Sequence, residues 1–192
     1  MKRLFRYCGG TIAALLGTMI CCDSRAEVRL PVQLQAQLVS RLATFDRNFK
    51  ARSGSLAYVL VVHKGASTES EVVARNFAKA IGELGEVGGV PSKVEEMTFS
   101  DGPTLAARCR AQHVAMVYFS IGLEPEMRGV AANFVGVDVL TVGASAQHAE
   151  NGAVVGFDLE EARPKIVLNL RSTRAQNISF KAELLKLARI VQ

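Results

Sequence analysis

The sequence predicts an α/β protein: a single-domain three-layer α/β/α sandwich with a mostly parallel sheet and an antiparallel C-terminal edge hairpin. Two observations carry this prediction. Short apolar runs alternate with segments of helical period as far as Gly143, and beyond it two apolar runs follow each other with no helix between them. Alternating strands and helices form parallel sheets with right-handed crossovers and helices on both faces.

The first helix, strand and second helix are the clearest elements. Apolar side chains recur every three or four residues and predict a helix over 31–50, which Gly54 ends. These side chains are Leu34, Leu38, Leu42, Phe45 and Phe49. The continuous apolar run at 57–62 is typical of a parallel strand covered on both faces. Thr68-Glu69-Ser70-Glu71 has the pattern of a capping box, which predicts a helix from there to about Leu84.

The same alternation continues in the middle of the chain. We expect strands at 94–99, 114–119 and 137–142, and helices at 104–112 and from Pro125 to about Phe134. The pattern then changes. Asn151-Gly152 indicates a tight turn, and 153–158 and 165–170 are expected to pair antiparallel at one edge of the sheet. A leucine-rich helix over 178–191 closes the chain.

Residues 1–26 have the features of a cleaved secretory signal peptide. Lys2, Arg3 and Arg6 precede a mostly apolar stretch of about 15 residues, and Ser24-Arg25-Ala26 supplies small residues for signal peptidase. That stretch is shorter than the roughly 20 residues a membrane-spanning helix needs. We therefore expect one soluble domain over 27–192, outside the cytoplasm and not embedded in a membrane.

Charge and cysteine content exclude several classes of protein. After removal of the leader, 19 Lys and Arg residues face 17 Asp and Glu residues, so composition gives no support to nucleic-acid binding. Cys8, Cys21 and Cys22 leave with the leader, and Cys109 then has no partner for an internal disulfide. A lone thiol is most often a small buried apolar group, and less often a site of intermolecular pairing or redox sensing.

No catalytic or metal-binding motif is present, and we expect neither an enzyme nor a cofactor. None of His63, His113 and His148 lies in a recognisable motif. Cys109 and His113 have helical i, i+4 spacing, but two ligands do not make a zinc site. Ser120 follows a strand without the Gly-x-Ser-x-Gly pattern of a nucleophile elbow.

A glycine cluster at Gly82, Gly85, Gly88 and Gly89 follows a helix, whereas a phosphate-binding loop follows a strand and opens a helix. We interpret the cluster as a helix terminus and a flexible loop.

One set of hydroxyl side chains offers an alternative function. The set is Thr68, Ser100, Ser120 and Ser145, each of which falls just after a predicted parallel strand. The loops at these strand ends form the crevice in which open α/β sheets bind ligands. A periplasmic small-molecule or anion-binding module therefore remains an alternative function. The purely structural interpretation is that these hydroxyls only cap helices.

The C-terminal part of the chain resembles the YfiR family. The similarity rests on Asn151-Gly152-Ala153-Val154-Val155-Gly156-Phe157, Lys165-Ile166-Val167-Leu168-Asn169-Leu170 and the leucine-rich segment 178–191, with Phe45-Asp46-Arg47-Asn48 near the start. The resemblance implies a small periplasmic α/β sandwich that represses an inner-membrane diguanylate cyclase by binding its periplasmic domain, which lowers cyclic di-GMP and biofilm formation. It brings no catalytic motif, and the internal disulfide that some members use does not carry over, because only Cys109 remains.

The closing helix is the first candidate for the partner surface, since its apolar side chains extend more than halfway round it. The candidate contact residues are Phe180, Leu184, Leu187, Ile190, Val191 and, on the preceding strand, Leu168. The alternative is a helix buried between the sheet and the first helix. A second candidate is the edge strand 165–170, through strand pairing with a partner or a second copy in a homodimer. The expected partner is an inner-membrane signalling protein, either a diguanylate cyclase or a sensor kinase, bound through its periplasmic domain.

Overall fold

A computed structural model describes residues 29–192, so the predicted signal peptide lies outside the described residues. The architecture is a sheet of eight strands in the order β2-β3-β1-β4-β5-β6-β7-β8. Strands β3, β1, β4, β5 and β6 are mutually parallel, and β6 and β7 are antiparallel. The predicted mostly parallel α/β fold with its antiparallel pair is confirmed. Within the described part of the chain, no helix has both the length and the apolarity to cross a bilayer.

The strands and helices alternate as the sequence indicates. The strands are β1 (Ala57–His63), β2 (Glu86–Val87), β3 (Val90–Thr98), β4 (Met116–Phe119), β5 (Leu140–Gly143), β6 (Val155–Glu160), β7 (Arg163–Asn169) and β8 (Arg189–Val191). The helices are α1 (Val32–Ala43), α2 (Phe49–Ser53), α3 (Thr68–Leu84), α4 (Gly102–Ala111), a 3-10 turn at Glu124–Glu126, α5 (Met127–Asn133), α6 (Ala146–Glu150), α7 (Leu170–Ala175) and α8 (Ala182–Leu187).

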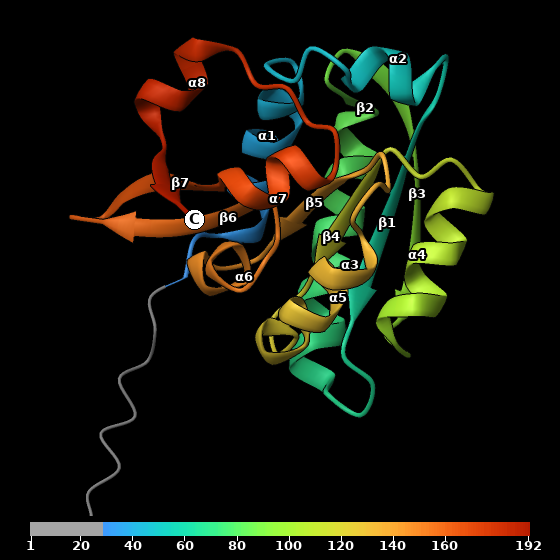
Figure 1. The fold of residues 1–192 in the computed structure, drawn as a ribbon. Helices are drawn as coiled ribbons and strands as arrows, with labels where there is room; N and C mark the ends of the chain where they lie inside the picture. The colour runs from blue at the N-terminus through green and yellow to red at the C-terminus, as the bar shows by residue number, and fades with distance from the viewer. Residues whose placement is uncertain (1–28) are drawn as a thin grey trace, which may run out of the picture.

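Helices cover both faces of the sheet, and the sheet divides the hydrophobic core into two clusters (Figure 1). Successive side chains of a strand point to opposite faces. Val59 and Val61 of β1 accordingly pack with α1 and α3, whereas Leu60 and Val62 pack with α4 and α5. This double burial explains why the parallel strands read as continuous apolar runs.

The predicted helix over 31–50 is interrupted. α1 ends at Ala43, a turn follows, and α2 begins at Phe49. The buried carboxylate of Asp46 causes the break, because its Oδ1 accepts hydrogen bonds from the backbone N–H of Asn48 (3.1 Å) and of Ser179 (3.1 Å). A short polar side chain that binds nearby backbone groups competes with a continuing helix.

Two turn predictions need adjustment. Ser67, one residue before the expected cap, accepts the hydrogen bond from the Ser70 N–H. The glycine cluster ends α3 at Gly85, as expected, but Gly88 and Gly89 form a tight β2–β3 hairpin rather than a flexible loop. A Cβ at Gly88 would lie 2.7 Å from the Phe49 ring, so this turn packs closely against α2.

The C-terminal third differs most from expectation. Two short helices, α6 and α7, flank the β6–β7 pair. The predicted closing helix over 178–191 is wrong at both ends, because α8 covers only Ala182–Leu187 and residues 189–191 form β8, which pairs in parallel with Val167–Asn169 of β7. The edge of the sheet beyond β7 is thereby occupied by β8 over those three residues.

Candidate functional site

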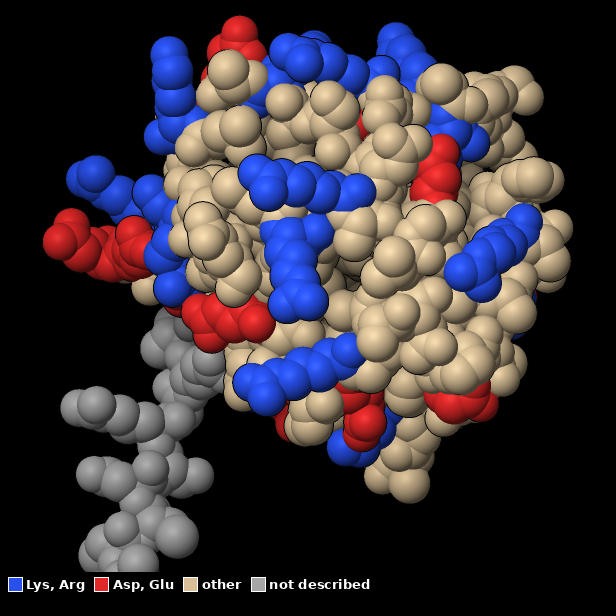
Figure 2. Space-filling model, viewed as in Figure 1, with Lys and Arg blue, Asp and Glu red and all other residues tan. Residues whose placement is uncertain are grey.

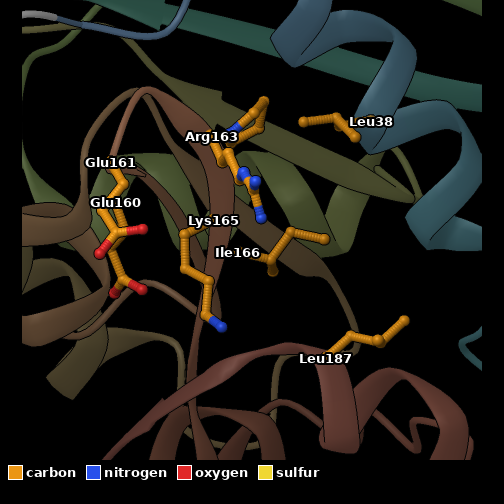
Figure 3. A pocket seen from close by; sticks show the side chains of 8 residues that line it. Leu38, Glu160, Glu161, Arg163, Lys165, Ile166 and Leu187 are labelled. Carbon is orange, nitrogen blue, oxygen red and sulfur yellow. The ribbon is translucent and has the colours of Figure 1, made fainter.

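The C-terminal face combines buried and exposed apolar side chains. Leu168, Phe180 and Leu184 belong to the core, with exposed fractions of 0%, 7% and 2%, so these three offer a partner no exposed side chain. Leu187 is 66% exposed and Ile190 38% exposed, and Val191 is half-buried. Leu184 therefore anchors α8 to the core, and Leu187 at the end of the same helix is exposed (Figure 3).

A groove lies beside these exposed residues (Figure 3). It has a volume of about 830 Å³ and runs between α1, the tip of the β6–β7 hairpin and α8. Leu38, Ile166 and Leu187 supply its apolar lining, and the charged lining residues are Glu160, Glu161, Arg163 and Lys165. Apolar and charged side chains thus line the groove together, and protein-binding surfaces combine both kinds.

The backbone of β7 limits strand addition at this groove. The N–H of Asn169 donates to the carbonyl of Val154 on the β6 side (3.0 Å), so alternate residues Leu168, Ile166 and Pro164 direct their backbone groups away from β6. Leu168 already faces β8, and Pro164 has no N–H. Only the N–H of Ile166 is left to donate along this stretch, so the expected strand pairing through 165–170 is largely precluded.

Charge pairs hold β8 in place. Arg189, the first residue of β8, donates from Nη2 to Asp158 (2.7 Å) and from Nη1 to Glu150 (3.3 Å). Each of these side chains is more than one third exposed. Pairs with that exposure contribute little singly, but the fork of one guanidinium to two elements fixes the register of a three-residue strand.

Asp46 links the N-terminal part of the domain to its C-terminal segment through hydrogen bonds. Its Oδ2 accepts from Nη2 of Arg52 (2.8 Å), and Nε of Arg52 donates to Asp138 (2.8 Å). The Asp46 and Arg52 side chains are 0% and 3% exposed. Asn48 adds a bond from its Nδ2 to the carbonyl of Asn177 (2.9 Å). The Asp46-Arg47-Asn48 motif is therefore a structural fastener between α1 and the C-terminal segment.

The predicted strand-end crevice is divided by the structure. Ser120 and Ser145 come together in the interior, whereas Thr68 and Ser100 are exposed. Sequence reasoning missed the group that joins the two serines, His148, which is fully buried. The signal was available in Gly143, because a Cβ there would stand 2.0 Å from the Cβ of His148.

Every polar atom of this cluster is bonded internally. The hydroxyl of Ser120 donates to the carbonyl of Ser70 (2.7 Å), and Nε2 of His148 lies 3.1 Å from the carbonyl of Ser120. Nδ1 of His148 lies 2.9 Å from the hydroxyl of Ser145, so the bonds correspond to the neutral Nε2–H tautomer. Burial lowers the pKa of His148, and Glu124, 3.6 Å away, opposes that effect. This arrangement favours the capping interpretation of the two serines.

The remaining candidate residues, Cys109 and His113, line the same pocket. Cys109 belongs to α4 and is buried in the core, and burial raises its pKa to about 12. His113 lies beyond the end of α4 with a φ of 51°, so the two residues do not share a helix face as their spacing suggested. Among residues 29–192 there is no cluster of three or more His, Cys, Asp or Glu side chains arranged to hold a metal ion.

The fold is a mostly parallel α/β sheet with helices on both faces. Solved structures agree on the fold: an ABC domain in complex with L-Trp from Streptococcus pneumonia (12% identity, TM-score 0.60, 84% of this chain and 62% of that one) and a conserved domain protein from Vibrio cholerae (12%, 0.61, 86% and 61%). A third is the ligand-free, open form of CD0873, a substrate binding protein with adhesive properties from Clostridium difficile (12%, 0.54, 76% and 57%). The chain thus spans about 60% of the length of these proteins.

Residues 32–189 match the family model described as YfiR/HmsC-like, and the chain belongs to that family. The match confirms the resemblance seen in the C-terminal segment. No curated protein sequence matches the chain.

Proposed function

We propose that this protein is a periplasmic regulator that binds the periplasmic domain of an inner-membrane signalling protein without catalysing a reaction. A diguanylate cyclase is the first candidate partner, and repression of it would lower cyclic di-GMP. Membership of the YfiR/HmsC-like family supports the regulatory role. The observation that carries the proposal is the exposed side chain of Leu187 beside the groove of Leu38 and Ile166.

The apolar centre of this face is small but has the right form. Leu187 lines the groove, and burying an apolar side chain of this size contributes about 1.5–3 kcal/mol. The charged side chains around the groove form the rim that excludes water from such a centre. Repression then requires that the receptor's inactive state bind this face more tightly than its active state.

The test compares substitutions at two exposed aliphatic residues, Leu187 and Val135. Leu187→Asp places a charge in the lining of the groove. Val135→Asp places a charge at a residue of similar exposure, 63%, that does not line the groove. We expect Leu187→Asp to weaken binding to the purified periplasmic domain of a diguanylate cyclase from the same host by about 30-fold or more, as for a hot-spot residue. Val135→Asp should bind like the wild type.

Folding is the control for both variants. Because Leu187 and Val135 are both exposed, each variant should keep the wild-type free energy of unfolding to within about 0.5 kcal/mol. If Leu187→Asp binds every candidate sensor domain as tightly as the wild type, or if the two variants lose affinity equally, the groove is not the partner surface.

A small-molecule-binding function is the second candidate, favoured by the likeness in fold to a domain in complex with L-Trp and to a substrate binding protein. The internal bonding of Ser120 and Ser145 argues against the crevice that this function needs. A thermal-shift screen separates the two, because a ligand at 100 times its Kd adds about 2.7 kcal/mol of stability. Light scattering of the same samples tests the predicted homodimer.

A further inference from the structure

One end of the molecule carries a net positive charge, whereas the rest of the domain is slightly acidic. Residues 44–53 and 170–187 form this end and hold seven Lys and Arg against two Asp and Glu, whereas the other residues of 29–192 hold twelve against fourteen. Figure 2 shows the blue side chains along its upper edge, where Figure 1 places α2 and α8. Such an uneven distribution gives the domain an electrostatic dipole.

Six of these cations, which we call the cationic end, are exposed: Arg47, Lys50, Arg171, Arg174, Lys181 and Lys186. None of the six forms an ion pair with another side chain of residues 29–192. The seventh, Arg52, is buried against Asp46, and Glu183 is the one exposed acid in these two segments. The charge of the cationic end is therefore not neutralised by acids within the described domain, although Nζ of Lys181 donates to the carbonyl of Thr44 (3.1 Å).

The fold holds these charges together rigidly. The N–H of Arg47 donates to the carbonyl of Ser179 (2.9 Å), and the N–H of Lys181 donates to the carbonyl of Phe45 (2.9 Å). These two bonds tie the segments from opposite ends of the sequence into one surface. On α8, Leu185 is 37% exposed between Lys181 and Lys186. Apolar side chains among cations are typical of segments that lie at a membrane surface.

From this arrangement we infer that the cationic end binds the surface of anionic phospholipids. The charges are spread over α2, α7, α8 and the segment before α2, which suits diffuse attraction to many headgroups. Each Lys or Arg near an anionic membrane strengthens binding about fivefold. The inference is independent of the proposed partner, because a vesicle contains no protein.

Sedimentation with vesicles tests it on the whole mature chain. We expect binding to phosphatidylcholine vesicles that contain about 30% phosphatidylglycerol, little binding to pure phosphatidylcholine, and release in about 0.5 M salt. Lys50→Gln with Lys186→Gln should weaken binding about 25-fold. The matched control is Lys64→Gln with Arg128→Gln, two exposed cations outside the cationic end, and should stay within about twofold of the wild type.

Three results would overturn the inference: no binding to the anionic vesicles at low salt, equal binding to neutral vesicles, or equal loss of binding in the two double variants. If vesicle binding is absent while the Lys50 and Lys186 variant loses affinity for a receptor domain, the cationic end serves an acidic protein face instead. Loss of receptor binding in Leu187→Asp with vesicle binding retained would leave both surfaces standing as separate sites.

Discussion

Replacement of Asp46 by alanine tests whether the first and last segments of the domain are held together by one buried carboxylate. The substitution removes the acceptor of the Arg52 guanidinium and of the backbone N–H groups of Asn48 and Ser179. Breaking a buried ion pair from one side costs about 3–5 kcal/mol, and each buried N–H left without an acceptor adds about 1–3 kcal/mol. Arg52 keeps its bond to Asp138, which reduces the total.

We therefore expect Asp46→Ala to lower the free energy of unfolding by about 4 kcal/mol, which corresponds to a fall in Tm of about 8–16 °C for a domain of this size. Urea denaturation followed by circular dichroism measures the free energy. Asp138→Ala is the matched control, because this carboxylate is 51% exposed and its loss should cost less than about 1 kcal/mol. If the two variants are equally stable, the fastener does not hold the domain together as we describe.

Three further outcomes follow from the buried groups. Gly143→Ala should destabilise the domain by about 3 kcal/mol or more, seen in the same urea assay, because the added Cβ meets that of His148 at 2.0 Å, and a soluble variant of wild-type stability would contradict the packing. Since the pKa of His148 is lowered in the fold, its contribution to stability is complete above the unfolded pKa of about 6.5 and falls at lower pH by up to about 1.4 kcal/mol per pH unit; His148→Gln should flatten that part of the Tm-versus-pH curve. Cys109, with its pKa raised to about 12 and its side chain buried, should react with a thiol reagent only on unfolding, and rapid labelling of native protein would refute this.

Much of the fold follows from the apolar pattern, because burial on both faces of a sheet leaves a local signature. The runs at 57–62 and 114–119 became β1 and β4, and the helix expected at 104–112 became α4, with Asp101 as its cap. These predictions succeeded because the determinants, capping side chains and alternating burial, lie within a few residues of the elements they specify.

The C-terminal segment could not be predicted by the same means. Leu184, Leu185 and Leu187 have a helical period, yet whether the chain continues as a helix past Ala188 depends on the free edge of β7, some 20 residues earlier in sequence. Pairing with that edge outweighs local helix propensity, which is a weak determinant. Of the candidate partner residues, Leu187 and Ile190 are therefore exposed, whereas Leu184 is buried.

The buried histidine cluster was missed for a related reason. Ser145 is the N-cap of α6 and His148 lies in that helix, whereas Ser120 follows β4, and the parallel order of β4 and β5 brings Ser120 to the other two. A glycine at the end of β5 was the one local sign of a close approach.

Pro164 has a consequence for the behaviour of this protein in concentrated solution. An open strand edge is a template on which further chains can add and grow into aggregates. Because the proline lies on the outward side of β7, an added strand finds an acceptor but no donor at that residue, and growth along the sheet is discouraged where the groove leaves it uncovered. The molecule can thus keep an apolar recognition surface exposed without polymerising through it.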